Sequence, residues 1–450
     1  MASPDPEITA TPTAWLAARA AGMPDRVAIR DASRALSYRE LLREAATVAV
    51  GLRRRGIAAG DRVAIEVEPS VNHGVLLHGV LLARAVAQPL RVELPATERD
   101  RTLGGDVAAV LGHSDADSVR GMPVADSVLN SASADEIAVE LLTSGTTGDP
   151  KRVRLSYGNF LWSAVGSAFS LGIDPGDVWL CCLPLNHVGG LAILFRSVIY
   201  GTAAELHPRF DVDAVAEALE RDVSLVSLVP TQLRRLIDAG APLDRARALV
   251  IGGAPVSEEL LREATEAGAC VVQTYGMTET ASQVATLGPA DAISHRGSAG
   301  RAAFATEIRI EEGGICVRGP IVAPASRGED GWLRTGDLGR IDEDGYLWVE
   351  GRGDDLIISG GENVHPAEVE SVLETHPAVV EAAVIGRPDP EWGSAVTAVI
   401  VLADGATVSE EELRSHCRAQ LAAYKVPKRI EFTSELPRTA GGKLIRQKLG

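Results

Sequence analysis

Short apolar segments alternate with amphipathic ones through most of the chain. Runs rich in Val, Ile and Leu are predicted to form buried strands at residues 62–68, 137–144, 178–184, 223–230, 248–254 and 270–276. Between them, segments such as 213–222 and 257–268 repeat apolar residues with the period of a helix. This alternation predicts an α/β fold, in which helices flank mainly parallel sheets.

The pattern changes after Trp348. Residues 349–355 are polar and punctuated by glycine, which favours a linker. Further strands are predicted beyond it at 379–386 and 395–402. Since 450 residues also exceed one ordinary core, we expect two domains. These are a large N-terminal α/β domain over residues 1–353 and a small, mobile α+β domain over residues 354–450.

Composition narrows the function classes. A net charge of −17 argues against general nucleic-acid binding. The longest apolar run, residues 75–90, contains His78 and Arg84, so we expect no membrane span, and the N-terminus lacks the features of a signal peptide. The five cysteines have no metal-binding spacing and fit reduced thiols in the cytoplasm. Small-molecule partners are therefore expected, and the sequence leaves open whether the chain forms a homo-oligomer.

Lysine is rare in this chain, which makes Lys151 stand out. It closes the stretch "LLTSGTTGDPK", whose small and hydroxyl residues are Thr143, Ser144, Gly145, Thr146, Thr147 and Gly148. Glycines let backbone N–H groups approach an anion, and lysine adds a compact point charge. The stretch predicts a phosphate-binding loop, although it lacks the Walker A pattern. The alternative is an ordinary polar surface loop.

Three further turns carry candidate chemistry. The turn "GGAP" (252–255) follows a predicted strand and offers bare backbone to a flat ring. In "YGMTE", Tyr275 could cover a base, Thr278 could meet a phosphate and Glu279 could hold Mg²⁺. In "GWLRTGDLG", Asp337 could accept hydrogen bonds from two vicinal hydroxyls, as ribose requires. Taken singly, each motif is more often a turn with a solvated acid.

Taken in order, these motifs and the C-terminal "LPRTAGGKLIRQKL" resemble the adenylate-forming superfamily of acyl-CoA synthetases, nonribosomal adenylation domains and luciferases. The resemblance runs from about residue 25 to the C-terminus. It implies an enzyme that activates a carboxylate with ATP and Mg²⁺ as an acyl-adenylate and then transfers the acyl group to CoA. It also implies that the small domain rotates between the two steps.

The resemblance assigns roles to individual residues. It matches Thr143–Lys151 to the β- and γ-phosphates, Gly253, Ala254 and Tyr275 to adenine, Thr278 to the α-phosphate, Glu279 to Mg²⁺, Asp337 and Arg352 to ribose, Asp354 to the hinge, and Gly360 and Gly361 to the thiol path. Lys443 matches the mobile catalytic lysine. A mobile ammonium suits this role because negative charge builds on the α-phosphate in the transition state.

Some positions depart from the family pattern or carry no assigned role. Arg152 stands where the family usually has glycine, and it could tighten the grip of the loop on phosphate or simply face solvent. The segment 318–332 is shorter than in most acyl-CoA synthetases. Lys425 is expected to be structural or to contact an anion.

The acid pocket of this superfamily is built around residues 183–201. No acidic residue lies near His187 in the sequence, which disfavours an amino acid as substrate. We expect Gly189, Gly190 and Ala192 to leave room beside His187. His187 itself could gate the pocket or stack on a ring and is counted among the candidate catalytic residues. The alternative is a packed structural histidine.

Candidate partners for a second polar group on the acid are Arg196, Ser282 and Gln283. In this region the chain looks most like the o-succinylbenzoate–CoA ligase subfamily of menaquinone biosynthesis. Another aryl- or medium-chain acyl-CoA ligase is the alternative. A non-catalytic nucleotide-binding relative is the third reading, and the presence of Glu279 and Lys443 argues against it.

Overall fold

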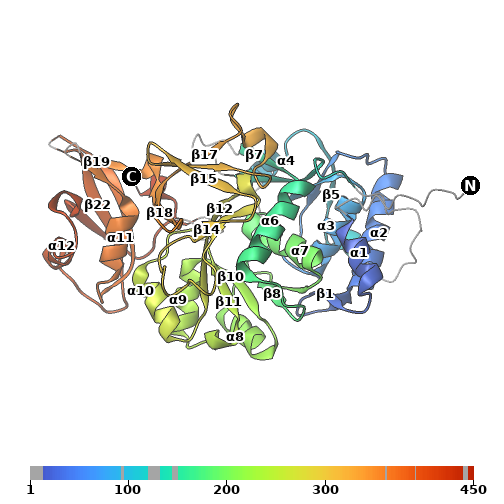
Figure 1. Cartoon of the computed structure of the whole chain (residues 1–450), viewed down its shortest axis with the longest axis horizontal. Helices are drawn as coiled ribbons and strands as arrows, with labels where there is room; N and C mark the ends of the chain where they lie inside the picture. The colour runs from blue at the N-terminus through green and yellow to red at the C-terminus, as the bar shows by residue number, and fades with distance from the viewer. Residues whose placement is uncertain are drawn as a thin grey trace, which may run out of the picture.

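The computed structural model describes residues 14–92, 96–119, 132–143, 151–359, 362–390, 392–438 and 444–449. In Figure 1 the elements up to β18 form a large body, and the later elements form a smaller lobe at the left. The mixed α/β architecture predicted from the sequence is confirmed.

The largest sheet has nine strands. Their order is β14 (Arg301–Ala302), β13 (Ser282–Thr286), β12 (Val271–Met277), β11 (Ala248–Ile251), β10 (Leu225–Leu228), β8 (Val178–Cys181), β9 (Ala203–Leu206), β1 (Val27–Arg30) and β2 (Ala35–Ser37). From β12 to β1 each strand is parallel to its neighbour. At one end β13 and β14, and at the other end β2, are added in antiparallel. The carboxyl ends of β11 and β12 therefore meet at one edge, where open α/β sheets bind ligands.

A second sheet has five strands. Their order is β5 (Val107–Leu111), β3 (Arg62–Ile65), β4 (Val86–Pro89), β6 (Ile137–Thr143) and β7 (Lys151–Ser156). The strands β6 and β7 are antiparallel, and Thr143 pairs with Lys151 at the described end of the pair. The candidate phosphate loop is thus the connection of two paired strands.

Helices occupy two kinds of position, which their sequences predict. The inner helices α3 (Val71–Leu82), α6 (Tyr157–Leu171) and α7 (Val188–Tyr200) are largely buried and contribute to one core shared with strands of both sheets. A helix that is apolar on all sides must be covered on all sides. No helix among the described residues is long and apolar enough to cross a bilayer.

The outer helices bury a single stripe. In α8 (Val212–Arg221) the stripe is Val215, Ala218 and Leu219, and in α10 (Glu258–Glu266) it is Leu260, Leu261 and Ala264. Both helices pack on the large sheet through a second apolar core, together with α9 (Pro230–Asp238). The remaining helices of the body are α1 (Trp15–Gly22), α2 (Tyr38–Arg54), α4 (Ala96–Leu103) and α5 (His113–Asp117).

A third sheet carries the ribose candidates. Its strands are β15 (Glu307–Glu311), β16 (Gly314–Arg318), β17 (Leu333–Ile341) and β18 (Leu347–Arg352), all antiparallel. The prediction of a linker over 349–355 is wrong for its first part, because residues up to Arg352 pair with β17. A short 3-10 turn, η4 (Gly353–Asp355), follows directly.

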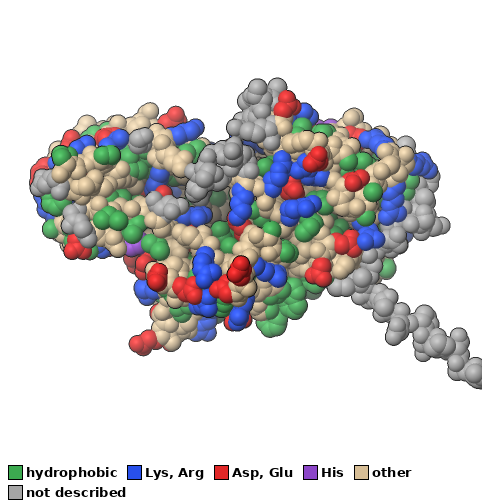
Figure 2. Space-filling view, turned by 90° about the horizontal axis from the view of Figure 1, so that it is seen from above, with side chains coloured by type: hydrophobic (Ala, Val, Ile, Leu, Met, Phe, Trp, Pro, Cys, Tyr) green, Lys and Arg blue, Asp and Glu red, His purple; other side chains and the backbone are tan. Residues whose placement is uncertain are grey.

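The C-terminal lobe combines a small sheet with two helices. It contains β19 (Ile357–Ser359), β20 (Glu362–Val364), α11 (Pro366–Glu374), β21 (Val379–Asp389), β22 (Gly393–Leu402), α12 (Glu410–Arg418) and β23 (Arg429–Thr433). The strands β21 and β22 are antiparallel, β23 adds in parallel, and the lobe has its own apolar core. In Figure 2 the lobe lies at the left, and acidic and basic side chains are interspersed on the face shown.

Ion pairs fix the last residues of the chain to this lobe. Arg446 donates to both carboxylate oxygens of Glu370 on α11 and lies 3.5 Å from Asp355. Arg438 lies 3.1 Å from Glu381 on β21. Lys425 donates to both oxygens of Glu368, so its structural reading is supported.

Candidate active site

A strained turn at the end of β12 presents Thr278 and Glu279. The turn is a 3-10 element, η2 (Thr278–Thr280), and the chain then reverses through Ala281 and Ser282 at φ of 50° and 98°. Such values favour glycine, so these two positions store strain that the surroundings must hold. Gly276 makes the reversal possible, because a Cβ there would lie 1.5 Å from the carbonyl oxygen of Ser282.

Lys151 and Glu279 meet although they are far apart in the chain. The Nζ atom of Lys151 lies 3.3 Å from Oε1 of Glu279, whose side chain is 12% exposed. The described residues contain no cluster of three or more side chains that could ligate a metal. A single carboxylate nevertheless suits Mg²⁺ that is shared with nucleotide phosphates, because this ion keeps several oxygen ligands from water and substrate.

Asp337 forms the centre of a second polar group. Its carboxylate lies 2.9 Å from Nε of Arg352 and accepts a hydrogen bond of 2.6 Å from the hydroxyl of Tyr275. Burial and the negative charge of Asp337 raise the pKa of Tyr275, so this hydroxyl stays protonated and donates. The strand pairing of Asp337 with Arg352 places the two predicted ribose residues side by side.

The turn after β11 has the bare backbone expected of it. Gly253 is exposed and has φ of +82°, which favours glycine. A Cβ at Gly252 would lie 2.9 Å from a methyl carbon of Thr274 on β12, so glycine lets the two strand ends approach. Together with Ala254, these residues leave a surface of backbone at the sheet edge that also carries Tyr275.

His187 stands at the N-terminus of α7 and is exposed. Partial desolvation by the surrounding protein and the positive charge of Arg91 lower the pKa of its imidazole, which favours the neutral ring at pH 7. The expectation that Gly190 leaves room beside His187 is wrong. A Cβ there would lie 2.8 Å from the carbonyl oxygen of Pro184, so this glycine serves close packing of the backbone rather than an open pocket.

Arg196 is a buried cation. It is 2% exposed, its guanidinium lies over the ring of Trp179 at 5.5 Å, and Nη2 donates to Oγ of Ser163 at 3.3 Å. No carboxylate among the described residues lies within ion-pair distance, and Nε has no hydrogen-bond partner. Burial lowers the pKa of the guanidinium. An unpaired buried charge is costly, so this position demands an explanation.

The side chain of Gln283 shows a similar imbalance. Gln283 is 2% exposed, and within the described structure neither polar atom of its amide has a hydrogen-bond partner. A buried amide without partners costs free energy unless a ligand or water satisfies it. Ser282 precedes it in the strained turn and is half-buried.

Sequence reasoning missed Ser163, which connects Arg196 to the turn after β12. Ser163 on α6 accepts from Arg196 and donates to the carbonyl oxygen of Ala281 at 2.7 Å. The buried arginine is thus connected through one hydroxyl to the turn that carries Glu279. A serine inside a helical segment gives no signal of this kind, because the contact joins residues 118 positions apart.

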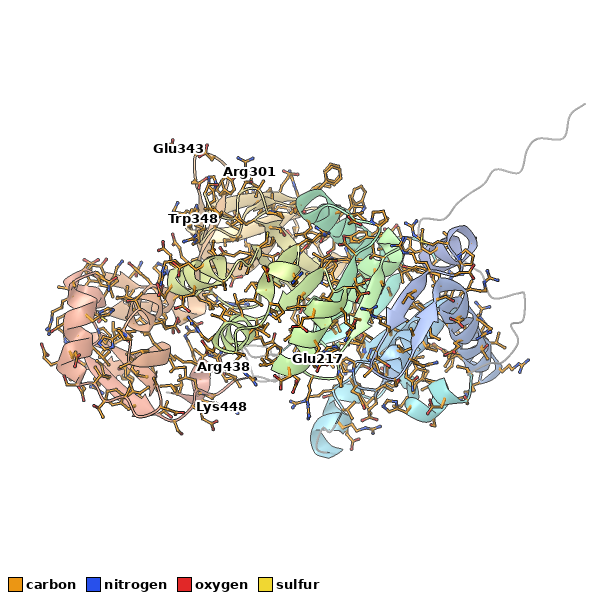
Figure 3. The ribbon with its side chains drawn as sticks, turned by 90° about the horizontal axis from the view of Figure 1, so that it is seen from below. Glu217, Arg301, Glu343, Trp348, Arg438 and Lys448 are labelled. Atoms are coloured by element: carbon orange, nitrogen blue, oxygen red, sulfur yellow. The ribbon has the colours of Figure 1, made fainter. Side chains whose placement is uncertain are left out.

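Several predicted site residues lie outside the described residues. They are Ser144, Gly145, Thr146, Thr147, Gly148, Gly360, Gly361 and Lys443. The backbone of Asp354 belongs to η4, directly after β18. Figure 3 shows Arg438 and Lys448, which flank Lys443 in the chain, at the edge of the C-terminal lobe that faces the large body.

Comparison with known families gives a consistent result. Residues 16–325 match the model of the AMP-binding enzyme family, and residues 368–443 match the model of the AMP-binding enzyme C-terminal domain. The chain therefore belongs to the AMP-binding enzyme family. The adenylate-forming resemblance inferred from the motifs is thus confirmed.

Proteins similar to this chain align with it over nearly their full length. The chain is 41% identical to 2-succinylbenzoate–CoA ligase from Geobacillus kaustophilus, with 97% of this chain and 96% of the relative covered. A structure of o-succinylbenzoate CoA synthetase (MenE) from Bacillus subtilis with the acyl-adenylate intermediate OSB-AMP has a TM-score of 0.89 at 37% identity, covering 97% and 98% of the chains. The structure of that enzyme with ATP and magnesium ion has a TM-score of 0.88 at 36% identity, covering 97% and 99%.

Proposed function

We propose that this chain is an AMP-forming acid–CoA ligase that acts on 2-succinylbenzoate. The succinyl carboxylate attacks the α-phosphorus of ATP, which releases pyrophosphate and leaves an acyl-adenylate. The thiol of CoA then attacks the acyl carbon, which releases AMP and gives 2-succinylbenzoyl-CoA. The similarity to 2-succinylbenzoate–CoA ligases over 97% of the chain supports this reaction.

The polar pairs of the site support an ATP-binding role for the large body. Lys151 and Glu279 already lie 3.3 Å apart, so a phosphate at the lysine and Mg²⁺ at the carboxylate would be neighbours. Mg²⁺ would neutralise phosphate charge there. Asp337 and Arg352 would hold ribose, Tyr275 and the 252–255 turn would hold adenine, and Thr278 would contact the α-phosphate.

The C-terminal lobe would supply the cation for adenylation. We assign residues 1–353 to the ATP- and acyl-binding domain and residues 354–450 to a mobile domain that turns at Asp354. Arg438 and Lys448 lie on the edge of the lobe that faces the body (Figure 3), which favours delivery of Lys443 from that side. Gly360 and Gly361 would line the path of the CoA thiol after rotation.

The observation that carries the choice of acid is the unpaired guanidinium of Arg196. A buried cation that lacks a carboxylate partner among the described residues, near the turn that carries Glu279, fits a substrate with a second negative group. We assign the aromatic carboxylate of 2-succinylbenzoate to Arg196, with Ser282 and Gln283 as hydrogen-bonding partners. Neutral His187 would lie beside the acyl chain without competing for that carboxylate.

The test is a complete reaction with ATP, Mg²⁺, CoA and 2-succinylbenzoate, followed by mass spectrometry of the thioester. The expected product is 2-succinylbenzoyl-CoA, with AMP and pyrophosphate in equal amounts. A panel with benzoate and medium-chain acids measures selectivity as kcat/KM. Preference for one of those acids would contradict the assignment of Arg196, and absence of any ATP–pyrophosphate exchange would contradict ligase activity itself. The five free cysteines fit a reducing compartment, so we place the enzyme in the cytoplasm.

A further inference from the structure

Arg152 joins the candidate phosphate loop to a neighbouring helix. Its Nη1 donates to Oε1 of Glu140 at 2.6 Å, and its Nη2 donates to the backbone carbonyls of Thr102 at 3.2 Å and Leu103 at 3.4 Å. Arg152 is the second residue of β7, directly after Lys151. Of the two alternatives for Arg152, the one in which it simply faces solvent is therefore wrong.

The contacts of Arg152 with Glu140, Thr102 and Leu103 form an anchor, and Glu140 is its anionic centre. It is 4% exposed, lies on β6 and also accepts from Nη1 of Arg62 at 2.7 Å. Burial alone would raise the pKa of its carboxyl, but the hydrogen bonds from Arg62 and Arg152 hold the pKa below its usual range. Arg154 approaches the other oxygen at 3.5 Å. The carboxylate therefore stays ionised, and its contacts with Arg152 and Arg154 link β6 to β7.

The end of α4 is shaped to receive the guanidinium. The last carbonyls of a helix have no partner within it, and they attract cations. Gln88 also donates to the carbonyl of Thr102, at 3.0 Å, which fixes this helix end on β4. Gly104 has φ of +63°, and a Cβ there would lie 2.4 Å from Nη2 of Arg152. The positive φ favours glycine at this position, and a side chain there would require the guanidinium of Arg152 to shift.

We propose that Arg152 is a positioning residue for ATP, which acts through Lys151. By fixing the start of β7 on α4 and Glu140, it sets where Nζ of Lys151 is presented opposite Glu279. This inference rests on the proposed assignment of residues 143–151 to the β- and γ-phosphates. Arg152 does not itself touch the nucleotide.

Binding of Mg²⁺·ATP and of AMP to the full-length chain, measured by calorimetry, tests the proposal. For Arg152→Gly we expect the Kd of ATP to rise about 10-fold, because small misplacements of a binding group cost affinity. The Kd of AMP stays unchanged, because AMP has no β- or γ-phosphate. Arg154→Gly is the matched control, since Arg154 lies on the same strand and beside the same carboxylate but, among the described residues, makes no hydrogen bond to α4. It should stay within about 2-fold of the wild type for both nucleotides.

Two further variants keep the test decisive if Arg152→Gly folds poorly. Arg152→Lys keeps the charge but cannot reach Glu140 and both carbonyls together, so an intermediate loss of ATP affinity is expected. Gly104→Ala keeps the arginine at position 152 but displaces its guanidinium. It should therefore also weaken the binding of ATP and leave the binding of AMP unchanged. In the Arg152→Gly background, Gly104→Ala should add little further loss. Equal weakening of ATP and AMP, or full additivity of the two substitutions, would overturn the proposal.

The outcome is independent of the acid. Nucleotide binding needs no acyl substrate, so failure of the wild type to form 2-succinylbenzoyl-CoA would count against the proposed function only. Conversion of a supplied acyl-adenylate to the thioester bypasses the β- and γ-phosphates. Its rate should be the same in Arg152→Gly and in the wild type, whereas general loss of structure would lower it.

Discussion

The nucleotide side and the acid side of the site differ in how their polar groups are satisfied. On the nucleotide side, Lys151 pairs with Glu279, and Asp337 pairs with Arg352. On the acid side, within the described structure, Arg196 has no carboxylate partner and the amide of Gln283 has no hydrogen-bond partner. We call the nucleotide side balanced, because these polar groups are paired before any ligand binds, and the acid side unbalanced, because its polar groups are not.

This difference has consequences for affinity and selectivity. A nucleotide must exchange existing ion pairs for its own, so each new contact yields a modest net gain. An acid with a suitably placed carboxylate would instead satisfy groups whose burial the fold has already made costly. Sites of this kind discriminate strongly against substrates that lack the matching group, because the buried polar atoms are then left unpaired.

The largest expected effect concerns a cation that neither region supplies. Lys151 and Arg352 are already paired with carboxylates, so charge that develops on the α-phosphate needs another partner. We expect Lys443→Ala to lower the rate of adenylation about 100- to 1000-fold. Thioester formation from supplied acyl-adenylate should be retained. Adenylation at the wild-type rate in this variant would show that the paired cations suffice, and the comparison would then need revision.

Arg196→Met tests the unbalanced side. We expect kcat/KM for 2-succinylbenzoate to fall about 10- to 100-fold, because a charged hydrogen bond is lost. The KM for ATP should not change. The protein without ligand should melt about 2–4 °C higher, since an unpaired buried charge is removed. Arg235→Met is the control, because Arg235 also lies over a ring, that of Phe210, but is exposed. Lower stability of Arg196→Met would contradict the view that this charge is uncompensated.

Asp337→Asn tests the balanced side. Arg352 and Tyr275 both lose the charge that they contact, so we expect the KM for ATP to rise about 10-fold and the melting temperature to fall. The loss should be equal for every acid in the panel. The exposed pair of Asp330 with Arg334 offers a control, because Asp330→Asn should change neither quantity. An acid-dependent loss in Asp337→Asn would mean that the two sides are not separate.

The smallest expected effect concerns a partly buried carboxyl outside the proposed site, and it tests whether burial of an incompletely compensated charge lowers stability there as well. Glu374 ends α11, and burial, together with the negative charge of Glu370, raises its pKa to about 7. A raised folded-state pKa contributes stability at acid pH that is lost as pH rises through about 7. Relative to the wild type, Glu374→Gln should therefore gain about 2 kcal/mol of unfolding free energy between pH 5 and pH 8. Urea denaturation at both pH values measures this, and Glu410→Gln, at an exposed position, is the control. Equal pH dependence in wild type and Glu374→Gln would rule the explanation out.

The sequence was sufficient for much of the fold. The predicted strands at 178–184, 223–230, 248–254 and 270–276 are all present as β8, β10, β11 and β12. The first three are shorter than predicted, and β12 is shifted by one residue. Their periodicity is a local property, and local properties can be read from one sequence. The linker prediction failed for residues 349–352, because the pairing of Arg352 with Asp337 depends on a strand elsewhere in the chain.

The candidate site was predictable where a motif carries its own chemistry. The structure brings together the predicted ribose pair, Asp337 with Arg352, and also Lys151 with Glu279, which were predicted as separate site residues. Their roles toward nucleotide stay predictions. The contact of Ser163 with Ala281 could not be predicted, because a helical serine has no distinguishing pattern. The prediction for Gly190 was wrong because only the folded structure shows that a carbonyl oxygen lies where a side chain at this position would be.

The tight fit between Gly104 and Arg152 also predicts how these two positions change in evolution. Since a side chain at position 104 would meet the guanidinium, arginine at 152 should be accepted more readily beside glycine at 104. Loss of the glycine would then require the guanidinium to shift from its contacts with the end of α4. Among related chains, arginine at position 152 should therefore occur together with glycine at position 104. Because the positive φ also favours glycine at 104, chains with a small residue at 152 should show this preference less strongly but should not lose it.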